Sequence, residues 1–549
     1  MTIKKLITTG TSIVAMMLGM APIATNAADP YVQTKVGLNG TTMAGISTGY
    51  RMTTKSRVEV DFAMTVLDSS TVGSRLFGVE DADGQGGMVL SVYMPGNNQK
   101  FAFRIGNGWN NRKEYWASVT PVVGSRHTAV FDIYHDKMHL ITGATTNWSQ
   151  TASDTIGTIS RDSTQPLALF AYMDGANRPI ASPTKAKIYR CKIYEKDVLV
   201  HDFEPSVKDG LIGFKDRVGG GFITKGGHWD CFDVGGDYMT YTSPYIATPV
   251  NNTDTYINTG YQIVSNACVA LECAPISDWD GLICYAFGAA GGSDDTAAGN
   301  FNIFHAFFRH DVGFGARILN TSGGWIQGFT PAGMLTNGVG GVVSMRRTFA
   351  IDTVVNSSGY GKTYVKTAGE SNGENIIHPL HLTKPGYHRL CLASAHAGTS
   401  TKASLKIYGC NIYESGVMQH EYVPAVVDGV VGLQDQNGTF ISAAAGTLTA
   451  GGFVPTISQT ATRISQRQTV TLTASAPGAV SYRWLKNGEA ISGGENGTLT
   501  VSWRKPTNAP TDTYKAMALY TTAGLTAASE ASDGLSIENM PAGLIIAIQ

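Results

Sequence analysis

Charged residues are scarce in this chain of 549 residues. Asp, Glu, Lys and Arg make up 15% of it, against a usual share of about 25%. The 41 basic and 42 acidic side chains leave a net charge of −1. This balance excludes the basic surface with which proteins bind nucleic acid, and it excludes a polybasic membrane anchor.

Long hydrophobic runs are missing after the N-terminal segment. Residues 1–27 contain two lysines at positions 4 and 5, an apolar middle and a Thr-Asn-Ala end, as a secretory signal peptide does. No later run approaches the roughly 20 apolar residues of a membrane-spanning helix. We therefore expect a protein that is secreted or displayed on the cell surface, with no transmembrane segment in its mature part.

Helix-forming sequence is scarce as well. We find no long amphipathic stretch. Glycine is abundant, since 64 glycines in 549 residues are a larger share than the usual one of about 7%. Short runs of alternating apolar and polar residues recur between Gly, Asn and Asp turns. This pattern predicts an all-β protein built from two-sheet antiparallel sandwiches.

One stretch occurs twice and organises the rest of the chain. Residues 187–216 align with residues 406–435 without a gap, and half of the thirty positions are identical. The further matches are Val58, Val60 and Phe62 with Val269, Leu271 and Cys273, Phe77-Gly78 with Phe287-Gly288, and Thr128 with Thr348. We predict two duplicated domains, at residues 28–243 and 244–453, and a third unit at residues 454–549.

Each copy of the repeated stretch predicts a hairpin. Tyr189, Cys191 and Ile193 alternate with polar residues, and the second copy alternates in the same way, so we expect these side chains on a buried face. The Asp-Gly pairs 209–210 and 428–429 predict turns into a second strand that is more fully buried.

Seven cysteines leave at least one without a disulfide partner. Cys191 and Cys410 face inward in separate domains, so we expect them to be buried free thiols. The alternative is a bridge from Cys391 to Cys410, although Ala168 takes the place of Cys391 in the first domain.

Candidate metal ligands are few. His228 and Cys231 supply only half of a tetrahedral zinc set. Two Asp-x-Asp-Gly sequences, at residues 81–84 and 278–281, have oxygen ligands that suit calcium, but they fall at different points of the repeat, as ordinary acidic turns would. We expect no cofactor, with calcium as the alternative.

The landmarks of the repeat resemble a known family. The strands at residues 46–50 and 58–62, the Phe77-Gly78 pair and the stretch at 187–216 are similar to those of concanavalin A-like, laminin G-like jelly-roll domains of bacterial secreted proteins. The resemblance implies two tandem antiparallel jelly-roll sandwiches. It implies a lectin, an adhesion module or a polysaccharide-active enzyme as the function.

The third unit resembles an immunoglobulin-like β-sandwich. Residues 470–474, 482–488, 499–501 and 512–516 are similar to strands B, C, E and F of that fold. Trp484 would be the core tryptophan and Tyr514 the corner tyrosine. Ala474 and Ala516 stand where the disulfide of the family would be, so we expect packing around Trp484 alone to hold this domain.

Residues 59–64 resemble part of an active site. Glu-Val-Asp-Phe-Ala-Met is similar to the Glu-x-Asp-x-(x)-Glu strand of jelly-roll glycoside hydrolases, but Ala63 or Met64 replaces the second glutamate. The second domain keeps only Glu272 of the set. Since retaining hydrolysis needs two carboxyl groups about 5 Å apart, we expect no enzyme, with a glycoside hydrolase as the less favoured alternative.

An Arg-Ile-x-Asn element followed by Trp occurs in both domains and is the candidate ligand site. Aromatic rings cover the face of a sugar while Arg and Asn bond to its hydroxyls. The candidate residues are Arg104, Asn107, Trp109 and Trp116 in the first domain and Arg317, Asn320 and Trp325 in the second. The alternative is that the tryptophans only cap the sandwich edge.

These features favour a non-catalytic carbohydrate-binding or adhesion protein whose partner is a polysaccharide or glycoconjugate. Two tandem domains would bind a repeating polymer with avidity, and the third would act as a spacer. The alternative is a structural or protein-interaction component of the bacterial cell surface, with cell-surface proteins as partners.

Overall fold

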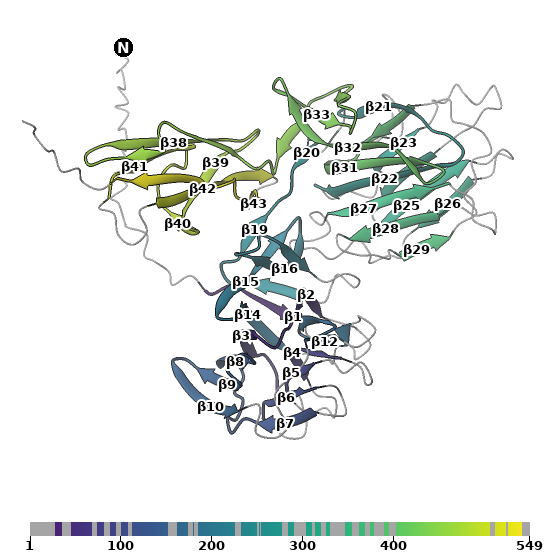
Figure 1. Cartoon of the computed structure of the whole chain (residues 1–549). Coiled ribbons are helices and arrows are strands. Elements are labelled where there is room, and N and C mark those ends of the chain that lie inside the picture. Colours follow the sequence, from purple (N-terminus) through teal and green to yellow (C-terminus); the bar gives the residue numbers. More distant parts are fainter. Residues whose placement is uncertain are drawn as a thin grey trace, which may run out of the picture.

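The computed structural model of the chain is built of strands and turns throughout the part it describes (Figure 1). The structure describes residues 28–35, 45–67, 74–81, 88–94, 100–107, 112–151, 162–173, 179–180, 185–224, 232–249, 252, 254–276, 284–289, 304–309, 313–319, 325–329, 346–353, 362–367, 374–377, 389–394, 402–504, 511–522 and 525–540. The predicted all-β class is confirmed over these residues, whereas the predicted signal peptide at 1–27 lies outside them. Within the same ranges, no helix has the length and apolar character to cross a membrane.

The first unit has two sheets that enclose one core. The first sheet contains β1 (Tyr31–Thr34), β3 (Ser56–Met64), β8 (Arg126–Asp132), β9 (Lys137–Thr142), β10 (Thr145–Thr151), β14 (Ala186–Glu195), β15 (Val198–Lys208), β16 (Leu211–Asp216), β17 (Phe222–Thr224), β18 (Phe232–Gly235) and β19 (Met239–Tyr241). The second contains β2 (Ile46–Arg51), β4 (Ser74–Glu80), β5 (Val89–Met94), β6 (Ala102–Gly106), β7 (Arg112–Trp116), β11 (Pro166–Leu169), β12 (Tyr172–Met173) and β13 (Pro179–Ile180). Alternation in β3 turns Val58, Val60 and Phe62 into the core, where residues of both sheets meet.

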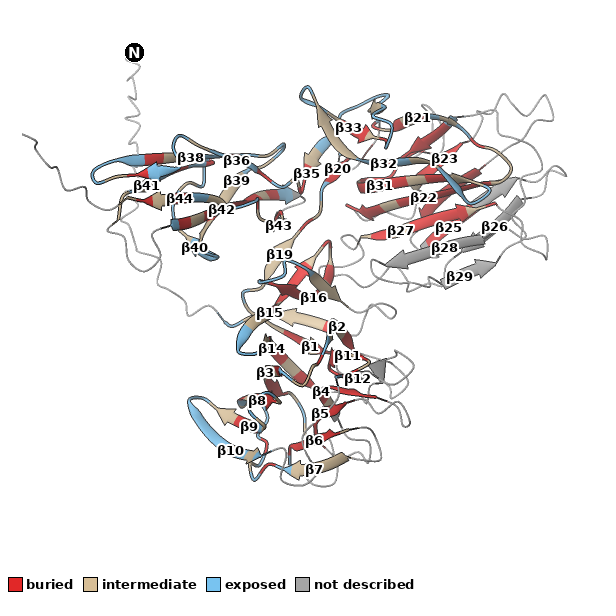
Figure 2. Cartoon of the chain, viewed as in Figure 1, coloured by how far each residue is buried: buried red, intermediate tan, exposed pale blue. Residues whose placement is uncertain are grey.

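The second unit repeats this arrangement. One sheet contains β20 (Tyr245–Ala247), β22 (Ala267–Pro275), β27 (Arg347–Asp352), β28 (Lys362–Thr367), β29 (Glu374–Ile377), β31 (Leu405–Glu414), β32 (Val417–Val427), β33 (Val430–Gln434), β34 (Phe440–Ser442) and β35 (Thr449–Gly451). The other contains β21 (Ile257–Gln262), β23 (Cys284–Ala289), β24 (Phe304–Arg309), β25 (Gly313–Leu319), β26 (Trp325–Phe329) and β30 (Arg389–Leu392). Figure 2 shows buried residues on the inner strands of both large units.

Strand register is the same in the two units. Val60 pairs with Cys191 in the first unit, and Leu271 pairs with Cys410 in the second. Ala168 pairs with Gly78, as Cys391 pairs with Gly288. The aligned landmarks therefore occupy equivalent places, whereas the boundaries at 243 and 453 stay a prediction.

A β-bulge corrects one predicted side-chain orientation. The register of β14 against β3 shifts between Ile188 and Arg190, so Tyr189 is an extra residue. Ile188 enters the core and Tyr189 is half-buried on the other face, whereas strict alternation predicts Tyr189 inside. Tyr408 is the extra residue of β31 and packs with Tyr245 outside the main core of its unit.

The second strand of each repeated hairpin is buried to a different extent. β16 begins with Leu211, which is 6% exposed, whereas β33 begins with Val430, which is 50% exposed. The prediction of a more fully buried strand is therefore right for β16 and wrong at the start of β33.

The cysteine prediction is confirmed for the two repeated positions. Cys191 and Cys410 are buried and free, and so is Cys391, so the alternative bridge is not formed. Burial raises the pKa of the Cys410 thiol to about 12, which leaves it protonated and inert at neutral pH. Cys231 lies outside the described residues.

The third unit packs around Trp484. It contains β36 (Thr456–Gln459), β37 (Arg463–Ile464), β38 (Thr469–Ser475), β39 (Ser481–Lys486), β40 (Glu489–Ile491), β41 (Thr498–Ser502), β42 (Thr511–Thr522), β43 (Leu525–Ala528) and β44 (Leu535–Asn539). The Trp484 side chain is buried, pairs across β39 and β42 with Ala516, and donates from Nε1 to the carbonyl of Gly494 at 3.1 Å. This packing agrees with the expectation that the unit holds together without a disulfide at Ala474 and Ala516.

A buried carboxylate ties the strands of the third unit together. The Asp512 side chain is 2% exposed and accepts two hydrogen bonds of 2.7 Å from Arg504, with further bonds from Asn487 and Asn539. Burial alone would raise the pKa of Asp512, but the bonds from Arg504, Asn487 and Lys486 hold it far below its ordinary value. A carboxyl group whose pKa is lowered by folding stabilises the fold above its unfolded pKa, and this stabilisation is lost as the pH falls toward the folded value.

We expect Asp512→Asn to lower the free energy of opening of β39 and β42 by about 2 kcal/mol at pH 7, because charge-assisted bonds are lost. The difference from the unchanged chain should shrink as the pH falls below about 4. Hydrogen–deuterium exchange of these strands measures both effects. Asp533→Asn, at an exposed position, is the matched control and should change nothing. A difference that grows in acid would contradict the assignment.

Candidate functional site

Strands β4 to β7 carry a ladder of polar residues on the face away from the core. Ser91, Arg104 and Glu114 pair in turn across β5, β6 and β7, and Gly78 of β4 lies opposite Ser91. Phe103, the neighbour of Arg104 in β6, points into the core. Since successive side chains of a strand face opposite sides, the ladder lies on the outer face of the sheet.

Arg104 is held by two carboxylates. Its Nη1 donates to Oε1 of Glu80 at 2.9 Å, and its Nη2 and Nε donate to Oε1 of Glu114 at 2.6 and 3.1 Å. Nη2 also donates to the hydroxyl of Tyr93 at 3.2 Å. With 6% of its surface exposed, Arg104 orients its neighbours, and its own contact with a ligand stays a prediction.

Glu80 has acceptor capacity left over. Its side chain is 1% exposed, and Oε1 accepts hydrogen bonds from Arg104 and from the hydroxyl of Ser91. Its other oxygen, Oε2, is buried without a hydrogen-bond partner among the described residues. A buried acceptor in that state is costly, so the position suits a bound hydroxyl or a water molecule.

Tyr93 forms the aromatic part of the cluster. The guanidinium of Arg75 lies 4.1 Å from its ring centroid and that of Arg104 lies at 4.8 Å, both as cation–π contacts. Burial, together with Glu114, raises the pKa of the Tyr93 hydroxyl, so this group stays protonated. Although burial opposes it, hydrogen bonds from Tyr93 and Arg104 lower the pKa of Glu114, which is therefore an anion at neutral pH.

The accessible part of the cluster lies on the edge strand β7. Glu114 has a side chain that is 32% exposed, Arg112 is half-buried, and Trp116 is 38% exposed. These residues alternate along β7 and so share one face. Trp116 pairs with Ala102, and Glu114 pairs with Arg104, so the exposed indole stands diagonally across from Arg104.

The candidate residues from the sequence fall into three groups. Arg104 and Trp116 come together on one face, and Asn107 is half-buried just after β6. Trp109 and Asn320 lie outside the described residues. Arg317 is in β25 and Trp325 in β26, where the strand register places them on neighbouring strands, but their side chains are likewise outside the description.

Sequence reasoning missed Glu80, Tyr93 and Glu114. The repeat gives no signal for them, because the register places His305 opposite Arg317 where Ser91 stands opposite Arg104. By the same register Phe307 replaces Tyr93 and Gln327 replaces Glu114. His305 is 4% exposed, with its ring 4.7 Å from that of Tyr285. Gln327 therefore brings no carboxylate to the position that Glu114 occupies in the first unit.

The acidic side chains of the hydrolase-like strand, β3, lie on the outer face of the other sheet. Glu59 and Asp61 have side chains that are 28% and 22% exposed, and Arg126 holds Asp61 with both Nε and Nη2. Ala63 and Met64, which replace the second glutamate, are both buried at 1% exposure. No second carboxyl group stands at the position that the hydrolase pattern requires.

The candidate metal ligands are only partly described. Both carboxylate oxygens of Asp81 accept hydrogen bonds from Thr164, one from its backbone nitrogen and one from its hydroxyl. The remaining Asp-x-Asp-Gly carboxylates and the His228–Cys231 pair lie outside the described residues. Among the residues that the structure does describe, no three His, Cys, Asp or Glu side chains gather as a metal site.

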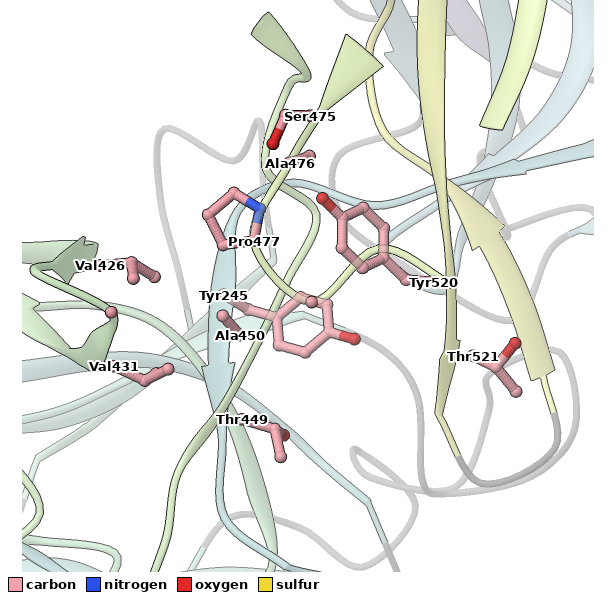
Figure 3. Close-up of a pocket in the computed structure, with 12 residues that line it drawn as sticks. Tyr245, Val426, Val431, Thr449, Ala450, Ser475, Ala476, Pro477, Tyr520 and Thr521 are labelled. Atoms are coloured by element: carbon pink, nitrogen blue, oxygen red, sulfur yellow. The ribbon is translucent and has the colours of Figure 1, made fainter. Parts of the chain in front are cut away.

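A concave site lies between the second and third units (Figure 3). It has a volume of about 660 Å³ and is bordered by the β32–β33 turn, by β20 and β35, and by the third unit. Tyr245 and Tyr520 point into it from either side, and the Tyr520 hydroxyl donates to the carbonyl of Phe453 at 2.7 Å.

The Arg104–Glu80 contact predicts a specific stability effect. Arg104→Gln should lower the free energy of unfolding of the first unit by about 3 kcal/mol, because the buried Glu80 carboxylate loses its main cation. Urea unfolding measures the loss. Arg51→Gln, at an exposed position of β2, should cost less than about 0.5 kcal/mol. Equal losses for the two variants would mean that Arg104 does not compensate Glu80.

No protein-family model matches the sequence, and no curated protein sequence matches it. Among solved structures, the chain is similar to the CBM40 module of the Ruminococcus gnavus IT-sialidase bound to α2,3-sialyllactose, with 12% identity over 29% of this chain and 90% of that one, at a TM-score of 0.22. It is similar to the binding domain of Paraclostridial Mosquitocidal Protein 1, with 9% identity over 77% and 88% of the two chains and a TM-score of 0.22. The NanB sialidase from Streptococcus pneumoniae has 10% identity over 90% and 88%, at a TM-score of 0.21. Likenesses this distant do not define the function of the chain.

Proposed function

We propose that the chain is a secreted or surface-displayed carbohydrate-binding protein that does not cleave its ligand. The observation that carries the proposal is the outer face of β4 to β7. There, an exposed indole stands beside a carboxylate and a guanidinium that other side chains hold in place. The ligand class is a polysaccharide or glycoconjugate.

The chemistry of this face suits a pyranose ring. Sugars need an apolar surface for the ring and fixed donors and acceptors for the hydroxyls. Trp116 provides the surface, Arg112 provides donors, and Glu114 provides acceptors. Because Arg104 already fixes Glu114, little side-chain entropy remains to be lost when a hydroxyl binds.

The second unit and the third unit have supporting parts in this proposal. We assign the second site to the sequence-derived candidates Arg317, Asn320 and Trp325, so that two weak sites would bind a repeating polymer with avidity. The finer assignment to tandem jelly rolls and an immunoglobulin-like spacer belongs to the same proposal. It includes no cofactor, and calcium would be added only by a measured dependence on that ion.

Trp116→Ala should weaken retention on gels that contain laminarin, alginate or pectin by about tenfold, because stacking on the sugar face is lost. Affinity electrophoresis measures this retention. Tyr134→Ala is the matched control, since Tyr134 is a similarly exposed aromatic residue, 46% exposed, on the turn between β8 and β9. Equal effects of the two variants, or none on any polysaccharide, would refute the proposed face.

A second measurement addresses cleavage. We expect no new reducing ends when the chain is incubated with a retained polysaccharide, because Glu59 has no partner acid at position 63 or 64. Reducing ends that form with the unchanged chain and disappear with Glu59→Gln would favour the hydrolase instead. Retention of a cell-surface protein without any dependence on sugar would favour the structural alternative.

A further inference from the structure

The first and second units are joined through a turn of the repeated hairpin. Asp209 and Gly210 connect β15 to β16, and we call this pair the docking turn. The Asp209 carboxylate accepts hydrogen bonds from the backbone nitrogen and the hydroxyl of Ser243, at 2.8 and 2.7 Å. Its backbone carbonyl accepts a hydrogen bond from the backbone nitrogen of Arg346, and its carboxylate accepts one from Nη1 of Arg346 at 3.1 Å.

This turn docks on a surface of the second unit that we call the Arg346 face. It consists of Arg346, Glu272, Tyr408, Tyr245 and Lys406. Nε and Nη2 of Arg346 donate to Glu272, both at 2.7 Å, which leaves Nη1 for Asp209. The guanidinium lies 4.7 Å from the centroid of the Tyr408 ring. Tyr408 packs on Tyr245 at 5.8 Å, and Lys406 lies over the Tyr245 ring at 4.5 Å.

The first unit has a corresponding surface at the equivalent positions, which we call the Arg126 face. It consists of Arg126, Asp61, Tyr189, Tyr31 and Lys187. Nε and Nη2 of Arg126 donate to Asp61, and its guanidinium lies 4.4 Å from the Tyr189 centroid. Tyr189 packs on Tyr31 at 5.9 Å, and Lys187 lies over the Tyr31 ring at 3.8 Å. Each of the contacts described within the Arg346 face therefore recurs within the Arg126 face.

The two faces differ in what reaches them. Tyr408 is 5% exposed at the joint, whereas Tyr189 is half-buried and the side chain of Arg126 is 43% exposed. Nη1 of Arg126 donates to Asp29, which stands where the second unit has Ser243. Asp29 therefore supplies to Arg126 the carboxylate that Asp209 supplies to Arg346.

The second unit carries the matching turn. Asp428 and Gly429 have φ angles of 50° and 79°, the same as those of Asp209 and Gly210. Asp428 is exposed, and its side chain makes no hydrogen bond or ion pair with the rest of the described chain. Gly429 borders the site between the second and third units and is itself exposed, so the third unit leaves the turn accessible.

We propose that a second copy of this chain docks its Asp428–Gly429 turn onto the Arg126 face, with the contacts that join the first unit to the second. The Asp428 carboxylate takes the position of Asp29 on Nη1 of Arg126. The contact is heterologous, since each copy offers a turn at one end and a face at the other. Repetition of the contact therefore builds a chain of copies rather than a closed dimer.

The association should be weak in solution. Within one chain the linker holds turn and face at an effective concentration in the millimolar range, an advantage that separate copies lack. Asp29 also competes for Arg126. Sedimentation velocity therefore needs protein up to the order of 1 mM, where we expect the weight-average mass to rise with concentration.

Three substitutions test the contact. Asp428→Asn and Arg126→Gln should each weaken association by about tenfold, because each removes one member of the pair. Asp29→Ser should strengthen it several-fold. The change removes the competing carboxylate and introduces the serine that Ser243 supplies in the joint between the first and second units. Asp136→Asn, on the turn between β8 and β9 of the first unit, is the matched control and should leave association unchanged.

Mixing the two weakened variants tests the head-to-tail geometry. Asp428→Asn retains an intact face and Arg126→Gln retains an intact turn, so an equimolar mixture should form dimers and nothing larger. A mass independent of concentration for both the unchanged chain and Asp29→Ser would overturn the proposal. Association of unchanged strength in both Asp428→Asn and Arg126→Gln would overturn it as well.

Discussion

Both large units depend on the antiparallel pairing of two long strands, β3 with β14 and β22 with β31. Val60 faces the core beside Cys191, and Leu271 faces it beside Cys410, so each pair is sealed on one side by apolar contacts. The other side of the same strands is polar. One side of the pair therefore builds the core, and the other is available for contacts with other units.

The bulge in this pairing creates that outer surface. An extra residue in β14 and in β31 turns Tyr189 and Tyr408 out of alternation and under the guanidiniums of Arg126 and Arg346. A tyrosine kept inside would leave those guanidiniums without their cation–π partner. The joint between the units therefore follows from a local irregularity of the strand.

The two outer faces of the first unit differ in how far the repeat preserves them. The contacts of Arg126 with its carboxylate and tyrosine neighbours recur around Arg346 in the second unit, with Glu272 in place of Asp61. The face of β4 to β7 keeps Arg104 as Arg317 but exchanges Tyr93 and Glu114 for Phe307 and Gln327. Such divergence suits surfaces that meet different parts of a ligand, whereas a shared joint tolerates less change.

The sequence by itself determined the all-β class, the repeated strands and the buried free thiols of Cys191 and Cys410. Burial along a strand has a period of two, and the chain carries that period in its residue order. It also pointed to Arg104 and Trp116. Only the tertiary structure decided that Glu80, Tyr93 and Glu114 gather around Arg104, since strand register brings together residues that are far apart in the chain. It likewise decided that Asp209 meets Arg346 while Asp428 stays exposed, because identical turns acquire different surroundings only when whole units pack.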